Sequence, residues 1–153
     1  MKFLKPFLIF LIINFAALGL GSWIMGAGAQ SEWYTSLNQA PWTPPGWVFG
    51  AAWTIIMICF SIYMAFLYLK KPTSKVITLF IVQFILNVSW NYVFFNQHLI
   101  ATGLAVIVAL TIVVGIFMVL FKNLMKVKTV LILPYFIWLC IATSLNAYIL
   151  LNN

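Results

Sequence analysis

The sequence predicts an all-α integral membrane protein, with five transmembrane helices in one bundle and a structured loop between the first two. Hydrophobic residues make up 65% of the 153 residues and charged residues only 6%, whereas soluble domains carry about 25% charged residues. The apolar residues form five runs, roughly 6–26, 45–69, 76–96, 99–121 and 129–150. Each run is close to the ~20 residues that span a bilayer as a helix. We therefore expect residues 1–153 to form a single membrane domain.

The eight lysines all lie outside these runs, in three groups. They are Lys2 and Lys5 before the first run, Lys70, Lys71 and Lys75 after the second, and Lys122, Lys126 and Lys128 after the fourth. Because basic loops stay cytoplasmic, we expect a cytoplasmic N-terminus and an external C-terminus, in a bacterial plasma membrane. Three groups at the membrane edge are typical of contacts with anionic lipid headgroups, whereas a nucleic-acid surface gathers its basic residues on one face.

The first run, 6–26, has an alternative interpretation as a cleaved secretory signal, because the small residues Ala27, Gly28 and Ala29 follow it. We interpret it as a retained helix. The apolar part of a signal usually has about 7–15 residues, and this run is longer.

The loop before the second run predicts a rigid lid. The consecutive prolines Pro44 and Pro45 fix the backbone immediately before Gly46, and proline is favoured where a helix begins. The chain should therefore enter the second helix at one defined angle, with Trp33 and Trp42 of the lid held over the bundle.

Three of the predicted helices carry an indole on a face with small or amide side chains. These faces are Gly46, Gly50 and Trp53 in 45–69, the amides Gln83, Asn87 and Asn91 with Trp90 and Phe94 in 76–96, and Trp138, Ala142 and Asn146 in 129–150. A rise of about 1.5 Å per residue places most of these side chains in the outer half of the membrane. We infer a cavity among these three helices that suits a flat, largely apolar ligand.

Packing alternatives stay open for several of these features. Intramembrane asparagines often join helices by hydrogen bonds, and the Gly46-x-x-x-Gly50 spacing serves close packing as readily as ligand access. On the fourth run, Ala101, Ala105 and Ala109 form a stripe of small residues that predicts a packing or dimer face.

The titratable residues exclude most enzyme mechanisms. The chain has one acidic residue, Glu32, one histidine, His98, and no aspartate or arginine. Carboxylate pairs, catalytic triads, metal sites and membrane proton relays all need more such groups. We predict no catalytic acid–base residues and no metal site. Whether His98 contacts a haem-like ligand stays open, because an isolated loop histidine is usually solvated.

Four separated blocks of this sequence resemble the TspO/MBR family, the tryptophan-rich sensory proteins whose mitochondrial members are called translocator protein or peripheral benzodiazepine receptor. The blocks are Trp33-Tyr34, Pro41 to Gly50 with Trp53, Leu86-Asn87 with Trp90 and Phe94-Phe95, and Pro134-Tyr135 with Trp138, Ala142-Thr143 and Leu145-Asn146. The resemblance implies a five-helix membrane fold, commonly dimeric, that binds porphyrins and other hydrophobic ligands in a pocket under the first loop.

The resemblance and the predicted cavity together give one set of candidate ligand-binding residues. They are Trp33, Trp42, Pro45, Gly46, Phe49, Gly50, Trp53, Asn87, Trp90, Asn91, Phe94, Trp138, Ala142, Leu145 and Asn146. The expected ligand is a porphyrin such as protoporphyrin IX or haem, with no cofactor required. Cholesterol is doubtful as a partner, because residues 145–151 lack the basic residue of the mitochondrial consensus.

The leading hypothesis is a membrane receptor or carrier for porphyrin-like ligands, linked to tetrapyrrole transport or stress sensing. One alternative is an enzyme that degrades porphyrin under light, with Trp53 and Trp138 as the reactive indoles. Another is a structural partner protein that associates through the alanine stripe of the fourth helix.

Overall fold

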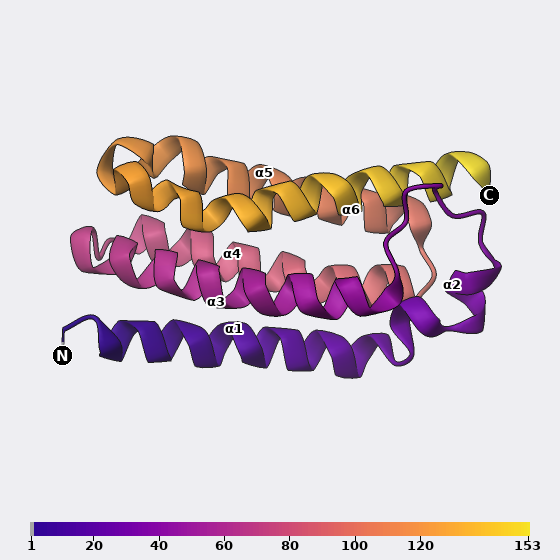
Figure 1. The fold of residues 1–153 in the computed structure, drawn as a ribbon, viewed down its shortest axis with the longest axis horizontal. Helices are drawn as coiled ribbons and strands as arrows, with labels where there is room; N and C mark the ends of the chain where they lie inside the picture. The colour runs from indigo at the N-terminus through magenta and orange to yellow at the C-terminus, as the bar shows by residue number, and fades with distance from the viewer. Residues whose placement is uncertain (1) are drawn as a thin grey trace.

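The computed structural model describes residues 2–153, which form long helices lying side by side (Figure 1). These are α1 (Leu4–Met25), α3 (Gly46–Lys70), α4 (Ser74–Asn91), α5 (Ile100–Met125) and α6 (Leu133–Asn152). Shorter elements connect them: η1 (Gly28–Gln30) and α2 (Glu32–Ser36) in the first loop, the π-helical η2 (Tyr92–Asn96) after α4, and the 3₁₀-helical η3 (Lys126–Ile132) between α5 and α6. The regular elements of the described residues are all helical, which confirms the all-α prediction.

Four helical stretches of residues 2–153 are long and apolar enough to cross a membrane: Leu4–Ser36, Gly46–Lys70, Ser74–Asn96 and Ile100–Asn152. The last stretch contains both α5 and α6, which pack against each other (Figure 1). The prediction of five separate spans is therefore met only in part. The physical reason is that residues 122–128, predicted as a loop, keep helical geometry as the end of α5 and the start of η3, so that the two long helices are joined without a break.

The long helices form a closed ring. Helix α1 packs against α3 and α4, α4 packs against α5, α5 against α6, and α6 returns to α3. The chain connections join helices that run in opposite directions, as Figure 1 shows for α5 and α6, but α3 and α4, although consecutive, are not neighbours in the ring. This order makes α1 a neighbour of both helices that carry the first two indole-bearing faces.

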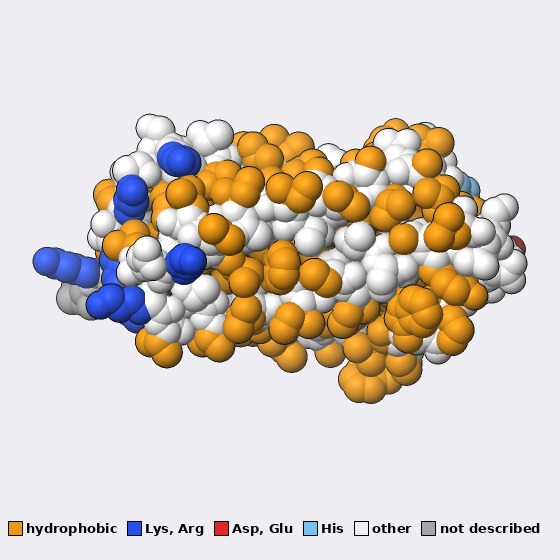
Figure 2. Space-filling model, turned by 90° about the horizontal axis from the view of Figure 1, so that it is seen from above, with side chains coloured by type: hydrophobic (Ala, Val, Ile, Leu, Met, Phe, Trp, Pro, Cys, Tyr) orange, Lys and Arg blue, Asp and Glu red, His pale blue; other side chains and the backbone are white. Residues whose placement is uncertain are grey.

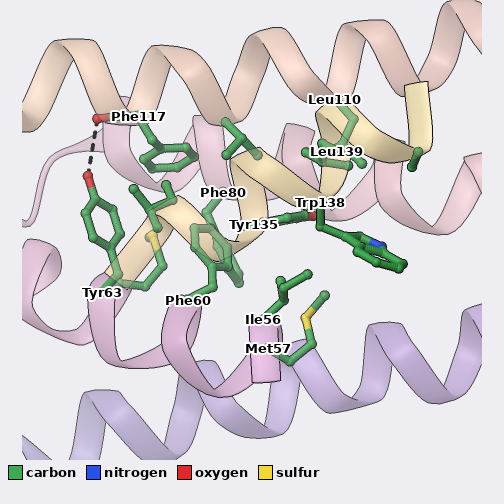
Figure 3. Close-up of a cluster of buried hydrophobic side chains, with 14 of the residues drawn as sticks. Ile56, Met57, Phe60, Tyr63, Phe80, Leu110, Phe117, Tyr135, Trp138 and Leu139 are labelled. Carbon is green, nitrogen blue, oxygen red and sulfur yellow. Dashed lines mark hydrogen bonds between the residues drawn. The ribbon is translucent and has the colours of Figure 1, made fainter. Parts of the chain in front are cut away.

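Aromatic side chains fill the half of the ring nearer the N-terminus (Figure 3). The ring of Phe60 lies 5.3 Å from that of Tyr135 and 5.8 Å from that of Phe117, and the Tyr63 hydroxyl donates a hydrogen bond to the Phe117 carbonyl at 3.2 Å. Burial of such large rings contributes the main packing energy of a core. These ring contacts pack α3, α5 and α6 together at this end of the bundle.

Two buried polar pairs join helices across the ring. The Asn14 amide of α1 donates to the Ser61 hydroxyl of α3 at 2.8 Å, and the Gln83 amide of α4 donates to the Tyr135 hydroxyl of α6 at 2.6 Å. Such bonds between membrane helices contribute about 0.6 kcal/mol each on average. Gln83, which shares the amide face of α4, therefore acts as a packing residue.

Charge is separated along the long axis of the molecule. Figure 2 shows the lysines at one end, and the single histidine and single acidic residue at the other. The lysine end holds the start of α1, the α3–α4 connection and η3, in agreement with the grouping of the lysines in the sequence.

Candidate functional site

A cavity of about 190 Å³ lies in the half of the bundle away from the lysines, between α1, α3 and α4. Its walls combine rings, small side chains, amides and hydroxyls, and none of the lining residues is charged. They are Ala17, Leu18, Ser22, Met25, Ala29, Phe49, Gly50, Trp53, Thr54, Asn87, Trp90, Asn91 and Phe95. This composition suits a flat, mainly apolar molecule with a few hydrogen-bonding groups.

Helix α3 supplies one face of the cavity, and the prolines before it set the direction of that face. Pro45 is extended, with φ −55° and ψ 147°, and α3 begins at the next residue, Gly46. From this start, Phe49, Gly50 and Trp53 line the cavity, and the Trp53 indole packs edge-on against Tyr135, with ring centroids 5.8 Å apart.

The two glycines of the Gly46-x-x-x-Gly50 spacing do not pack against another helix of this chain. A Cβ atom built at either position would meet no heavy atom of the chain within 4 Å. Gly50 is exposed and lines the cavity, as do the exposed Ser22 of α1 and Thr54 of α3. Of the two interpretations of this spacing, the geometry therefore favours access to the cavity.

Helix α4 supplies the amide face. The Asn91 amide donates to the Asn87 carbonyl oxygen at 3.0 Å, and Asn91 fits there because Gly21 of α1 has no side chain: a Cβ atom at Gly21 would lie 2.7 Å from Asn91 Nδ2. The Asn87 side chain is 5% exposed, and its amide makes no hydrogen bond with any residue in 2–153. Asn87 thus presents an unpaired amide in the cavity wall.

Asn146, the third asparagine of the predicted site, makes its hydrogen bonds outside the cavity. The indole Nε1 of Trp90 donates to Asn146 Oδ1 of α6 at 3.4 Å, and the Asn146 amide donates to the Ala142 carbonyl at 3.1 Å. Asn146 is therefore a packing partner of Trp90, and the ring of Trp90, stacked on Phe94 at 5.6 Å, is the part that lines the cavity.

The predicted residues of 129–150 lie behind the cavity wall and do not line it. Trp138, Ala142, Leu145 and Asn146 are all buried in α6, and the Trp138 indole packs edge-on against Phe49 at 5.5 Å. The sequence placed a cavity among 45–69, 76–96 and 129–150, whereas the structure has α1 in place of α6. The reason is the ring order: α1 packs along both α3 and α4, on the side where the cavity lies.

The sequence did not predict that residues of α1 and η1 line the cavity. Ala17, Leu18, Ser22, Met25 and Ala29 line the cavity, and none was proposed. A weak signal exists in the buried residues Asn14, Ala17 and Gly21, because their spacing of i, i+3 and i+7 marks one helix face.

The first loop covers the end of the bundle away from the lysines (Figure 1) and is held there by contacts of its aromatic side chains. Trp33 stacks on His98 at 4.1 Å and lies edge-on to Phe94 at 5.4 Å. Trp42 donates from Nε1 to the Ser144 hydroxyl at 3.1 Å. Of the predicted ligand-binding residues, Trp33, Trp42, Pro45, Gly46 and Phe94 do not line the cavity, and neither does His98.

Hydrogen bonds also attach this loop to the end of α6. The Asn38 backbone N–H donates to Asn153 Oδ1 at 2.8 Å, and the Asn153 amide donates to the Asn38 carbonyl at 3.3 Å. The Asn38 amide donates to the Asn152 carbonyl at 2.9 Å. We call this group of three bonds the loop clamp.

Tyr34 anchors the inner side of the loop. Its ring is 4% exposed and lies 5.5 Å from the ring of Phe95. Burial raises the pKa of the Tyr34 hydroxyl, so the phenol stays neutral. The loop thus rests on an uncharged aromatic base directly beside the cavity residue Phe95.

The fold and this site define an integral, multi-pass, all-α membrane protein with a cavity of rings and amides beside the first loop. The chain belongs to the TspO/MBR family, whose model matches residues 9–151. It is 35% identical over 115 residues to the tryptophan-rich sensory protein of Cereibacter sphaeroides, covering 75% of this chain and 73% of the relative. It is 34% identical over 144 residues to the tryptophan-rich protein TspO of Archaeoglobus fulgidus, covering 93% and 94%. The human translocator protein is 25% identical over 131 residues, covering 82% and 78%.

Proposed function

We propose that the protein is a membrane receptor or carrier that binds porphyrin-like and other flat hydrophobic ligands beneath the first loop. The observation that carries this proposal is the unpaired amide of Asn87 in a cavity wall shared with the rings of Trp53 and Trp90. Rings provide stacking surfaces and the amide provides orientation. The names of the relatives, tryptophan-rich sensory protein and translocator protein, support a sensory or transport role, and the proposal places this role in stress sensing or tetrapyrrole transport.

The proposal includes an arrangement in the membrane. The chain crosses it five times, with α5 and α6 as separate spans that turn at η3. The lysine end faces the cytoplasm of a bacterial cell, since basic connections stay inside, and the C-terminus lies outside. The exposed Ala101 and Ala105 of α5 offer a face for a homodimer. Cholesterol stays doubtful as a ligand, since residues 145–151 contain no basic residue.

Ligand binding requires the cavity to widen. Its volume of about 190 Å³ is below the ~300–1,000 Å³ of typical ligand pockets. The loop clamp and the contacts of Trp33 and Trp42 hold the loop over the bundle. We propose that the loop moves away when a porphyrin enters, while the helices keep their ring.

We favour binding over light-dependent breakdown of porphyrin. The breakdown hypothesis rests on Trp53 and Trp138 as reactive indoles, and only Trp53 lines the cavity. No catalytic residue or cofactor is part of the proposal.

The test is a titration of protoporphyrin IX into the protein in lipid nanodiscs, followed by the absorbance of the porphyrin. Asn87→Leu replaces the amide by an apolar side chain with the same branching at Cγ. Because a hydrogen bond contributes about 0.5–1.5 kcal/mol, we expect the dissociation constant to rise about two- to tenfold. Trp53→Phe removes part of the stacking surface, and we expect a rise of about threefold or more, since an aromatic pair contributes about 0.5–1.5 kcal/mol beyond its burial.

The matched control is Trp47→Phe, the same change at an indole that is 75% exposed and outside the cavity. Its affinity should equal that of the unchanged protein. Equal affinity in all three variants would refute the cavity as the porphyrin site.

A further inference from the structure

The cavity beside the first loop reaches the surface of the bundle on one side. The exposed residues among those that line it are Ser22, Gly50 and Thr54, and the other lining residues are buried or half-buried. Ser22 belongs to α1, and Gly50 and Thr54 belong to α3. The cavity therefore opens between α1 and α3. We call this opening, defined by these three residues, the side slot.

The side slot lies where α1 and α3 are not held together. The Asn14 amide donates to the Ser61 hydroxyl at 2.8 Å in the middle of the two helices, and the rings of Phe3 and Phe66 lie 4.5 Å apart at the lysine end. Towards the other end, a Cβ atom built on Gly50 would meet no heavy atom of the chain within 4 Å. The bundle thus leaves room at the slot without losing the contact between the helices.

Two exposed indoles indicate the depth of the side slot in the membrane. Trp23 is 80% exposed and Trp47 is 75% exposed, and tryptophan is enriched where lipid meets water. Along the axis of α1, Trp23 lies one residue beyond Ser22, which is about 1.5 Å. Along the axis of α3, Trp47 lies three residues beyond Gly50, which is about 4.5 Å. The slot therefore begins just below the interface, within reach of the lipid headgroups.

The cavity offers no cation to an acidic ligand. None of its lining residues is charged, and Figure 2 shows the lysines at the opposite end of the molecule. An ionised carboxylate that leaves water without a partner costs far more free energy than a lost hydrogen bond between neutral groups. Porphyrins such as protoporphyrin IX carry carboxylates, so their ring can enter the cavity only if the carboxylates stay in contact with water.

We propose that the side slot holds the acidic substituents of the ligand, with the ring in the cavity and the carboxylates at the headgroup level between α1 and α3. This inference rests on the proposed binding of porphyrin-like ligands. The Ser22 hydroxyl is the donor that lies at the slot for a carboxylate oxygen. The Thr54 hydroxyl donates to the Gly50 carbonyl at 2.8 Å and forms the lower wall. Because the slot lies on one side of the cavity, the preferred ligand is a flat molecule whose acidic groups lie on one edge.

The first loop is a less favourable place for these carboxylates. Its inner side is the buried ring of Tyr34, which packs on Phe95, and its helix α2 carries the acidic residue Glu32, which repels a second negative charge. His98 at the same end stacks on Trp33 and does not line the cavity. The side slot combines contact with the cavity and contact with the headgroups.

The test compares protoporphyrin IX with its dimethyl ester, which has the same ring without the two negative charges. Both are titrated into the protein in nanodiscs of phosphatidylcholine, and the ratio of the two affinities is compared between variants. Ser22→Lys should raise the affinity for the acid about two- to fivefold relative to the ester, the factor expected of an exposed ion pair. The stem of lysine lets its ammonium group lie at the headgroup level. Ser22→Glu should lower the same ratio by a similar factor.

The matched control is Thr102→Lys, which adds the same charge at an exposed residue of α5 outside the cavity. Its ratio should stay within twofold of that of the unchanged protein. The affinity for the ester shows in each variant whether the cavity is intact.

The outcomes separate this inference from the proposed function. If both ligands bind and the ratio is the same in Ser22→Lys, Ser22→Glu and the unchanged protein, the side slot is overturned while porphyrin binding stands. A ratio that rises in Glu32→Gln and not in Ser22→Lys overturns it as well, and places the carboxylates under the loop. If neither ligand binds the unchanged protein, the proposed function fails, and this inference fails with it.

Discussion

Breaking the loop clamp is expected to speed the entry of ligand. The change is Asn153→Ala, which removes both side-chain bonds to the Asn38 backbone, at 2.8 and 3.3 Å. An intramolecular hydrogen bond contributes a net ~0.5–1.5 kcal/mol, and these residues are exposed, so we take the lower end for each. The closed loop then loses about 1 kcal/mol, which is about fivefold in the ratio of open to closed forms.

The association rate of porphyrin reports this ratio directly. If the loop must open before the ligand enters, the rate is proportional to the open fraction. Stopped-flow mixing of protoporphyrin IX with the protein in nanodiscs should therefore show an association rate constant about fivefold higher in Asn153→Ala.

The matched control is Asn152→Ala. Its side-chain amide bonds only to the Tyr148 carbonyl within α6, whereas its part in the clamp is its backbone carbonyl, which alanine keeps. The control should associate at the rate of the unchanged protein. An unchanged rate in Asn153→Ala would refute entry through the loop and favour entry between α1 and α3. Equal acceleration in both variants would show that fraying of the end of α6 is the cause.

Two further predictions concern stability, measured as the unfolding midpoint in detergent. Gly103→Ala should destabilise the fold by about 1–3 kcal/mol, because the new Cβ atom would lie 2.9 Å from Phe94 Cδ2. The control Gly19→Ala has no neighbour within 4 Å of its new Cβ atom and should be neutral or stabilising. Equal midpoints for the two variants would contradict the close packing at Gly103. Tyr135→Phe should lower the free energy of unfolding by about 1–3 kcal/mol, because the hydroxyl that accepts from Gln83 at 2.6 Å is lost and the Gln83 amide stays buried without that partner. An unchanged midpoint would show that this pair does not hold α4 to α6.

Most of the helical architecture follows from the sequence, because an apolar run in lipid has to satisfy its backbone hydrogen bonds internally. The predicted starts of 45–69 and 99–121 lie within one residue of α3 and α5. The boundary between α5 and α6 was less accurate. Helix α5 continues past residue 121 to Met125 and includes Lys122, because a lysine at a helix end can bury its stem and still hold its charge in water.

For the site, the sequence predicted which side chains share a face of each helix, but it did not predict which helices lie opposite one another. Spacing along α4 placed Asn87, Trp90 and Asn91 on the side that lines the cavity, because a period of 3.6 residues fixes which side chains share a face. Spacing does not state which helix lies opposite. Trp138 has the residue type and depth expected of a cavity residue, yet its indole packs on Phe49, since α6 and α1 occupy different sides of α3 in the ring.

The three asparagines show why packing and binding could not be separated from the sequence. By residue type, Asn87, Asn91 and Asn146 are equivalent, and each can join helices or contact a ligand. In the structure, Asn146 accepts a bond from Trp90, and the Asn91 amide bonds to the backbone of α4. The Asn87 side chain makes no hydrogen bond within residues 2–153, so a ligand with a hydrogen-bonding group can pair with it without first breaking a bond inside the protein. The polar group that contributes least to packing is thus the one best placed to favour the ligand-bound form.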